Sequence, residues 1–203
     1  MNVLFANFFF FIQGLLYGLE ITSLRQNEMQ KLESYLKKLL KQVQNLPERT
    51  ASEATYLMMG CIPVIGELHK RLLKTFGNII RKDNSIKKDI ALRQLALKGQ
   101  NSDSWKKSQK SSLNSLHDLI VNPPTQSSWN RSVGTTINKY YVNQMVKDAE
   151  NKSSLKFLHL SEARYGHCHN IWSSCGTEPF TVTMAAVKVK LATGTQSKIR
   201  RER

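Results

Sequence analysis

The sequence predicts an all-α protein, and three observations carry this prediction. Apolar residues recur at helical spacing in several long segments. No segment alternates polar and apolar residues for long enough to build a sheet. Hydrophobic residues make up 40% of the 203 residues, enough to fill a core. We therefore expect a multi-helix bundle with an irregular C-terminal loop region and a basic, disordered tail.

The N-terminus differs from the rest of the chain, and residues 1–13 are set apart as an apolar segment. The wider run 3–19 is apolar apart from Asn7 and Gln13, but it is shorter than the roughly 20 residues that a membrane span needs. A signal peptide would also carry Lys or Arg before the apolar run, and none is present. Two interpretations stay open: a buried or foreign start, and a signal or membrane anchor.

Residues 14–98 are expected to form a basic amphipathic helical domain. Its first long helix spans about 24–45, with Thr22 or Ser23 as the N-cap and Pro47 as the stop. The apolar arc of this helix is assigned to Leu32, Tyr35, Leu36, Leu39, Leu40 and Val43. The opposite arc is assigned to Lys31, Lys37, Lys38 and Lys41.

The same domain contains three further helices with their own signals. Thr50 and Glu53 form a capping box that opens a short helix through Met59, before Gly60. A helix over about 64–81 repeats the pattern of an apolar inner face and a basic outer face. Another helix is expected over about 84–97, before Gly99.

The C-terminal half is expected to be less regular. Residues 99–124 are a linker with a short helix near 104–115 that carries Trp105. Residues 125–193 form a helical and loop region, with helices over about 125–151 and 180–191 around a loop at 153–179. Residues 194–203 form the basic tail.

The charge balance points to a polyanionic partner. The chain has 30 Lys and Arg against 15 Asp and Glu, a net charge of +15, and residues 25–110 alone hold 18 basic and 8 acidic side chains. Because the bases gather opposite apolar faces, we expect binding to the phosphates of RNA or DNA inside the cell, in the nucleus or cytoplasm. The candidate contacts are Lys37, Lys38, Lys41, Arg71, Lys74, Arg81, Lys82, Lys87, Lys88, Lys106, Lys107, Lys198, Arg200 and Arg201.

No catalytic constellation is present in the sequence, so we expect neither an enzyme nor a cofactor. Phosphate-binding glycine loops, paired catalytic aspartates and nucleophile elbows are all missing. The three cysteines do not suggest a disulfide scaffold. Cys168, His169 and Cys175 are weak zinc candidates, because the ligand types suit zinc but the spacing does not. His69, Cys61, Trp129 and Trp172 are expected to be packed. For Trp105 two interpretations stay open: it stacks on an unpaired base, or it anchors a helix to the core.

A series of short segments, taken in order, resembles one family. The segments are Leu16-Tyr17-Gly18-Leu19-Glu20, Gln44-Asn45-Leu46-Pro47-Glu48-Arg49-Thr50-Ala51, Leu57-Met58-Met59-Gly60, Glu67-Leu68-His69-Lys70-Arg71, Phe76-Gly77-Asn78-Ile79-Ile80-Arg81, Arg93-Gln94-Leu95-Ala96, Ser153-Ser154-Leu155-Lys156 and Lys190-x-x-Thr193-Gly194-Thr195. They resemble the region C-terminal to the reverse transcriptase domain in the large polyprotein of non-LTR (LINE-like) retrotransposons of invertebrate animals.

The resemblance covers about residues 14–195 and implies a truncated, non-catalytic fragment of that polyprotein. It implies that the chain helps to hold element RNA or target DNA, with the missing polymerase domain as a partner. The polymerase's paired aspartates and the endonuclease have no counterpart here. Two alternatives remain: a small membrane-associated or secreted basic protein anchored by residues 3–19, and a remnant without independent function.

Overall fold

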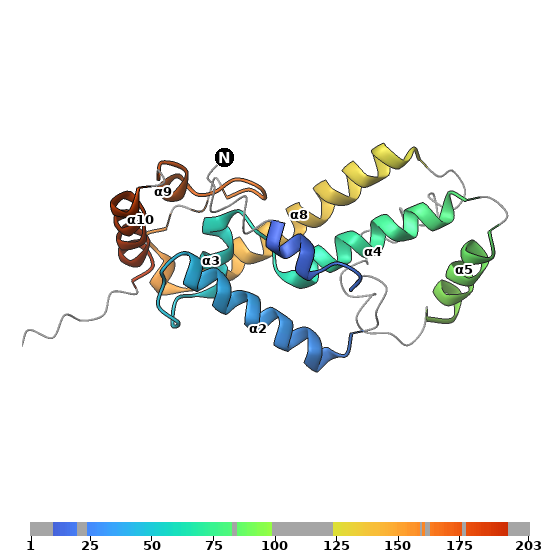
Figure 1. Ribbon diagram of the computed structural model, residues 1–203, viewed down its shortest axis with the longest axis horizontal. Coiled ribbons are helices and arrows are strands. Elements are labelled where there is room, and N and C mark those ends of the chain that lie inside the picture. Colours follow the sequence, from blue (N-terminus) through green and yellow to red (C-terminus); the bar gives the residue numbers. More distant parts are fainter. Residues whose placement is uncertain are drawn as a thin grey trace, which may run out of the picture. The chain divides into compact units, whose positions relative to one another are not determined.

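The computed structural model of the protein describes residues 10–19, 24–82, 85–98, 124–158, 160, 163–175 and 178–194. Helices dominate these ranges and no strand occurs in them, so the predicted all-α class is confirmed. The helices labelled in Figure 1 are α2 (Gln26–Val43), α3 (Ser52–Met59), α4 (Val64–Ile80), α5 (Ile86–Lys98), α8 (Gln126–Glu150), α9 (Asn170–Ser173) and α10 (Pro179–Ala192). The 3-10 turn η1 (Ser153–Leu155) follows α8 in the chain.

The chain divides into two compact units. The first unit comprises Met1–Leu68 and Thr136–Arg203, and the second comprises His69–Thr135. The division passes through α4 and α8, so each of these helices contributes one part to each unit.

The core of the first unit lies beneath α2. Leu16, Leu36, Val64 and Leu68 form one buried cluster, with further apolar side chains of α2 packed against it. Leu16 follows a short helix over residues 10–15, whose Phe10 is 75% exposed. Within the described residues 10–19, the N-terminal apolar run is therefore only partly buried. Across the described residues, the structure contains no helix with both the length and the apolar character needed to cross a membrane.

Two helix starts differ from the sequence-based expectation. The N-cap of α2 is Arg25, whose backbone N–H donates to the Glu28 carboxylate at 2.8 Å. The N-cap of α3 is Ala51, not Thr50. Thr50 is 2% exposed, and its Oγ1 has no hydrogen-bond partner in the part of the chain that the structure describes. The predicted capping box is wrong because Thr50 lies within the preceding turn and is covered by packing.

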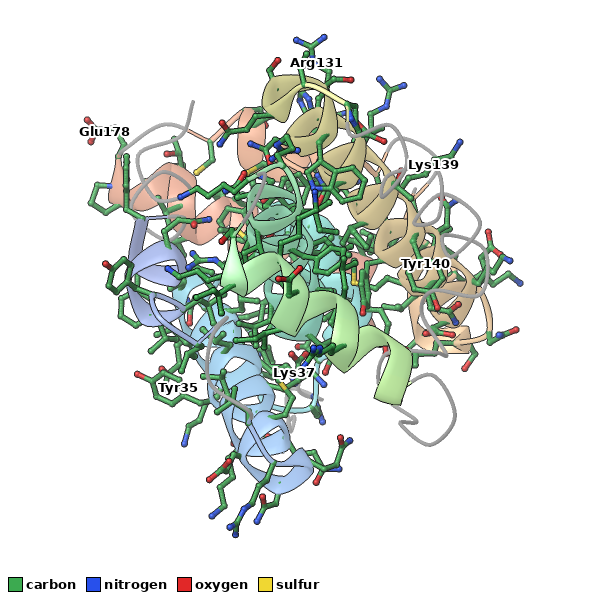
Figure 2. The ribbon with its side chains drawn as sticks, turned by 90° about the vertical axis from the view of Figure 1, so that its right-hand side faces the viewer. Tyr35, Lys37, Arg131, Lys139, Tyr140 and Glu178 are labelled. Carbon is green, nitrogen blue, oxygen red and sulfur yellow. The ribbon has the colours of Figure 1, made fainter. Side chains whose placement is uncertain are left out.

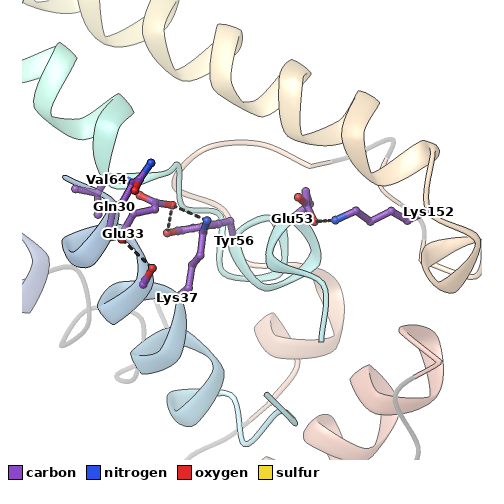
Figure 3. Close-up of polar contacts among 8 residues, drawn as sticks. Gln30, Glu33, Lys37, Glu53, Tyr56, Val64 and Lys152 are labelled. Atoms are coloured by element: carbon purple, nitrogen blue, oxygen red, sulfur yellow. Dashed lines mark hydrogen bonds and ion pairs between the residues drawn. The ribbon is translucent and has the colours of Figure 1, made fainter. Parts of the chain in front are cut away.

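The far end of α3 is held by a loop distant in sequence. Gly60 ends α3 in the left-handed conformation, with φ of +62°, and its carbonyl accepts from the Gly166 N–H at 2.8 Å. The His169 N–H donates to the Met58 carbonyl at 3.0 Å. At the start of α3, the Lys152 ammonium donates to the Glu53 carboxylate (Figure 3). The two backbone contacts satisfy carbonyls at the end of α3 that would otherwise lack partners.

In the second unit, α4 and α8 contact each other through an indole ring. The Trp129 Nε1–H donates to the Leu73 carbonyl at 2.9 Å, and Trp129 is 8% exposed. A Cβ atom on Gly77 would lie 2.0 Å from that nitrogen, so only glycine permits this approach. The prediction that Trp129 is a packed residue is confirmed, as is that for Trp172, which is 3% exposed.

Candidate nucleic-acid interface

The inward side of α2 is fixed by a half-buried carboxylate, that of Glu33. Glu33 accepts hydrogen bonds from the Tyr56 hydroxyl at 2.8 Å and from the Val64 N–H at 3.0 Å (Figure 3). Val64 is the first residue of α4, so Glu33 joins α2 to the start of the next long helix. Burial raises the pKa of Tyr56 far above its ordinary value, and the negative charge of the Glu33 carboxylate raises it further. This phenol stays a neutral donor.

Two of the predicted α2 contacts belong to the scaffold of the first unit. The Lys37 Nζ lies 3.5 Å from Glu33, and its side chain is 37% exposed. The Lys41 Nζ donates to the Glu48 carbonyl at 2.6 Å, which ties the turn after α2 back onto the helix. Burial lowers the pKa of Lys41. These two ammonium groups are therefore already engaged, whereas Lys38 is exposed.

The outward side of α2 carries the predicted contact Lys38, together with Lys31, which was expected on the basic arc but was not among the predicted contacts, and Tyr35, which was expected on the apolar arc. Lys31 and Lys38 are exposed, and Tyr35 between them is 54% exposed. Assigning Tyr35 to the apolar arc was wrong. The three residues stand four and three positions apart, so they share one face of the helix. That spacing was the signal available in the sequence.

A second basic face lies on α4 and just beyond its end, within the second unit. Arg71, Lys74, Arg81 and Lys82 fall on one side of the helix, while Leu73, Phe76 and Ile80 are buried on the other. The Arg81 Nη2 donates to the Asn78 side chain at 2.6 Å. No acidic residue occurs between positions 69 and 82.

The remaining predicted contacts lie either on α5 or outside the residues that the structure describes. On α5, Lys87 is exposed and Lys88 is half-buried, with Asp89 beside them. The other predicted contacts lie outside the described residues, and they are Lys106, Lys107, Lys198, Arg200 and Arg201. The stacking candidate Trp105 also lies outside the described residues.

The three weak zinc candidates make contacts with the protein itself in the described structure. The His169 Nδ1 accepts from the Ile171 N–H at 3.3 Å and so caps α9. The Cys168 thiol lies 3.9 Å from the Met59 carbonyl, and burial raises its pKa to about 11. Cys175 lies 3.8 Å from the Thr181 hydroxyl. Within the described ranges, no three His, Cys, Asp or Glu side chains gather in a metal-binding arrangement.

Fold and site together define an all-α protein with basic outer helix faces. No protein-family model matches the chain, and neither the curated proteins nor the solved structures give a match. The likeness to retroelement polyproteins therefore stays a prediction based on the sequence segments given above.

Proposed function

We propose that this chain is a non-catalytic nucleic-acid-binding segment that contacts phosphates through the outer faces of α2 and α4. One observation carries the proposal. Residues 69–82 hold five basic residues and no acidic one, and four of the five lie on one side of α4 or just beyond its end. Surface helix faces that only face solvent mix acids and bases, whereas phosphate-binding faces concentrate bases. An intracellular place of action, in the nucleus or cytoplasm, forms part of this proposal.

The disposition of acids on α2 supports the same function. This helix contains two acidic residues, Glu28 and Glu33. Glu28 bonds the backbone of Arg25 at the N-terminus, and Glu33 is turned inward to Tyr56 and Val64. Beyond its first turn, the outward face therefore presents lysine without a competing carboxylate. A polyanion approaching this face meets attraction along most of the helix.

The test is a salt titration with labelled RNA and duplex DNA. If four phosphates are contacted, affinity for duplex DNA should fall roughly 100-fold between about 50 and 200 mM salt. The variant Lys74→Glu with Lys82→Glu should weaken binding and flatten the salt slope by about 2. The matched control is Lys139→Glu with Lys147→Glu, which changes the net charge equally at two exposed positions of α8.

The two variants separate a specific face from general basicity. Equal losses in both would mean that net charge alone attracts the ligand. Affinity that is independent of salt would contradict phosphate binding altogether. Circular dichroism of each variant shows whether the helices are retained, so that unfolding is not mistaken for lost contacts.

A further inference from the structure

An exposed aromatic ring lies between two ammonium groups on α2. Tyr35 is 54% exposed, with Lys31 four residues before it and Lys38 three residues after it. Figure 2 shows Tyr35 and Lys37 on opposite sides of α2, so the ring lies away from the side on which Lys37 meets Glu33. The ring adds little to the core, which α2 fills with Leu36 and Leu40.

This arrangement is specific to Tyr35 when compared with another exposed tyrosine. Tyr140 on α8 is 44% exposed, but its ring meets that of Tyr141 edge-on, with centroids 5.2 Å apart. The positions three and four residues from Tyr140 carry no basic side chain. For Tyr35, two of these four positions are lysines. Of these two exposed tyrosines, Tyr35 therefore combines an unstacked face with flanking cations on its own helix, and Tyr140 does not.

We propose that the outer face of α2 binds single-stranded nucleic acid, with an unpaired base stacked on Tyr35 and neighbouring phosphates paired with Lys31 and Lys38. This inference rests on the nucleic-acid binding proposed above and names the form that is bound. Every base has a π face, so stacking tolerates any sequence, but the face must be exposed. In a duplex the base faces are covered by neighbouring pairs, so Tyr35 gains nothing there.

The experiment compares Tyr35→Ala, Tyr35→Phe and the control Tyr140→Ala in the full chain. The probes are a short oligouridylate and an RNA duplex of the same length, followed by fluorescence anisotropy at fixed salt. Tyr35→Ala should weaken binding of the single strand roughly 5- to 150-fold, which corresponds to about 1–3 kcal/mol for one stacked base. Tyr35→Phe keeps the ring and should bind like wild type, as should Tyr140→Ala.

The slope of affinity against salt and the affinity for the duplex distinguish a loss of stacking from a loss of charge or fold. The slope of affinity against salt should be unchanged in Tyr35→Ala, because no cation is removed. It should become shallower by about 1.4 in Lys31→Gln with Lys38→Gln, because two contacts to a single strand are lost. Duplex affinity should not change in Tyr35→Ala.

The possible failures point to different conclusions. If wild type binds RNA but Tyr35→Ala binds both probes as wild type does, the stacking inference is wrong and phosphate binding stands. An equal loss for strand and duplex also overturns stacking, since the ring would then act without an unpaired base. If wild type binds neither probe, the proposed function itself fails.

Discussion

Replacing Gly77 by alanine tests the contact between α4 and α8 in the second unit. The added Cβ would lie 2.0 Å from Nε1 and 2.3 Å from Cδ1 of Trp129. Both separations are far below van der Waals contact, so the indole must move. Movement breaks the 2.9 Å hydrogen bond from Nε1 to the Leu73 carbonyl. One methyl group thus disturbs both packing and a buried polar pair.

The expected cost follows from these two effects. Overpacking costs about 1–3 kcal/mol, and an unsatisfied buried N–H costs about 1–3 kcal/mol. Alanine has a higher helix propensity than glycine, and this difference stabilises the folded state by about 1 kcal/mol. We expect Gly77→Ala to lower the free energy of unfolding by about 3 kcal/mol. Gly134 is the matched control, because a Cβ on this α8 glycine meets no atom within 4 Å. Gly134→Ala should raise stability by about 1 kcal/mol.

The assay is urea unfolding followed by circular dichroism, with tryptophan emission as a second probe. In Gly77→Ala the native emission should shift to longer wavelength as Trp129 becomes hydrated. Combining Gly77→Ala with Trp129→Phe tests the contact itself, since phenylalanine lacks Nε1. The alanine should then cost less than it does in wild type, which is the non-additivity expected of touching residues. Equal stability of Gly77→Ala and Gly134→Ala would refute the packing described for this pair.

Three further predictions concern the first unit. Gly60→Ala should cost about 2–4 kcal/mol in urea unfolding, because its Cβ would meet backbone at 2.3 Å; Gly166→Ala, also at positive φ but in open space, should cost only about 1 kcal/mol. Burial alone would raise the pKa of Glu53, but the Lys152 hydrogen bond brings this pKa below its ordinary value. Lys152→Met should therefore cost about 1 kcal/mol at neutral pH and less as acid protonates Glu53, and an equal loss at all pH values would contradict this. The Cys168 thiol, with a pKa of about 11, should react slowly with iodoacetamide at neutral pH and faster as pH rises, as peptide mapping would show.

Helical periodicity predicted the long helices well. The predicted helix at 125–151 corresponds to α8 at Gln126–Glu150, and the one at 180–191 to α10 at Pro179–Ala192. In α8 the apolar residues Trp129, Val133 and Ile137 recur every four residues and are all buried, so their spacing is a signal that the local sequence carries. In α10 Phe180, Met184 and Leu191 stay exposed, so apolar spacing there does not mark one buried side. The three-residue turn η1 and the four-residue α9 were not predicted, because so short an element shows no periodicity.

The two flanks of α2 show why the candidate site was predicted less well than the helix. Tyr35 and Lys37 both neighbour the buried Leu36, about 100° to either side of it around the helix. Periodicity alone does not decide which flank is covered. Residue polarity suggested that Tyr35 is inside and Lys37 outside. Tertiary contacts reverse this, because Glu33 bonds α3 and α4 on the flank of Lys37.

In the folded first unit, several acidic side chains are largely buried while basic side chains such as Lys31 and Lys38 are exposed. The net charge alone does not reveal this difference. Several acids of the first unit are drawn inward: Glu67 is 5% exposed, and the side chains of Glu33 and Glu53 are 18% and 21% exposed. A carboxylate at such depth requires donors, and Glu33 finds a phenol, a helix N-terminal N–H and an ammonium group. Each inward acid removes a negative charge from the surface, while bases such as Lys31 and Lys38 stay outside. The face of α2 is therefore more positive toward solvent than its sequence composition suggests. Because the carboxylate that turns inward also joins the helices, the same contacts that stabilise the first unit create its basic surface.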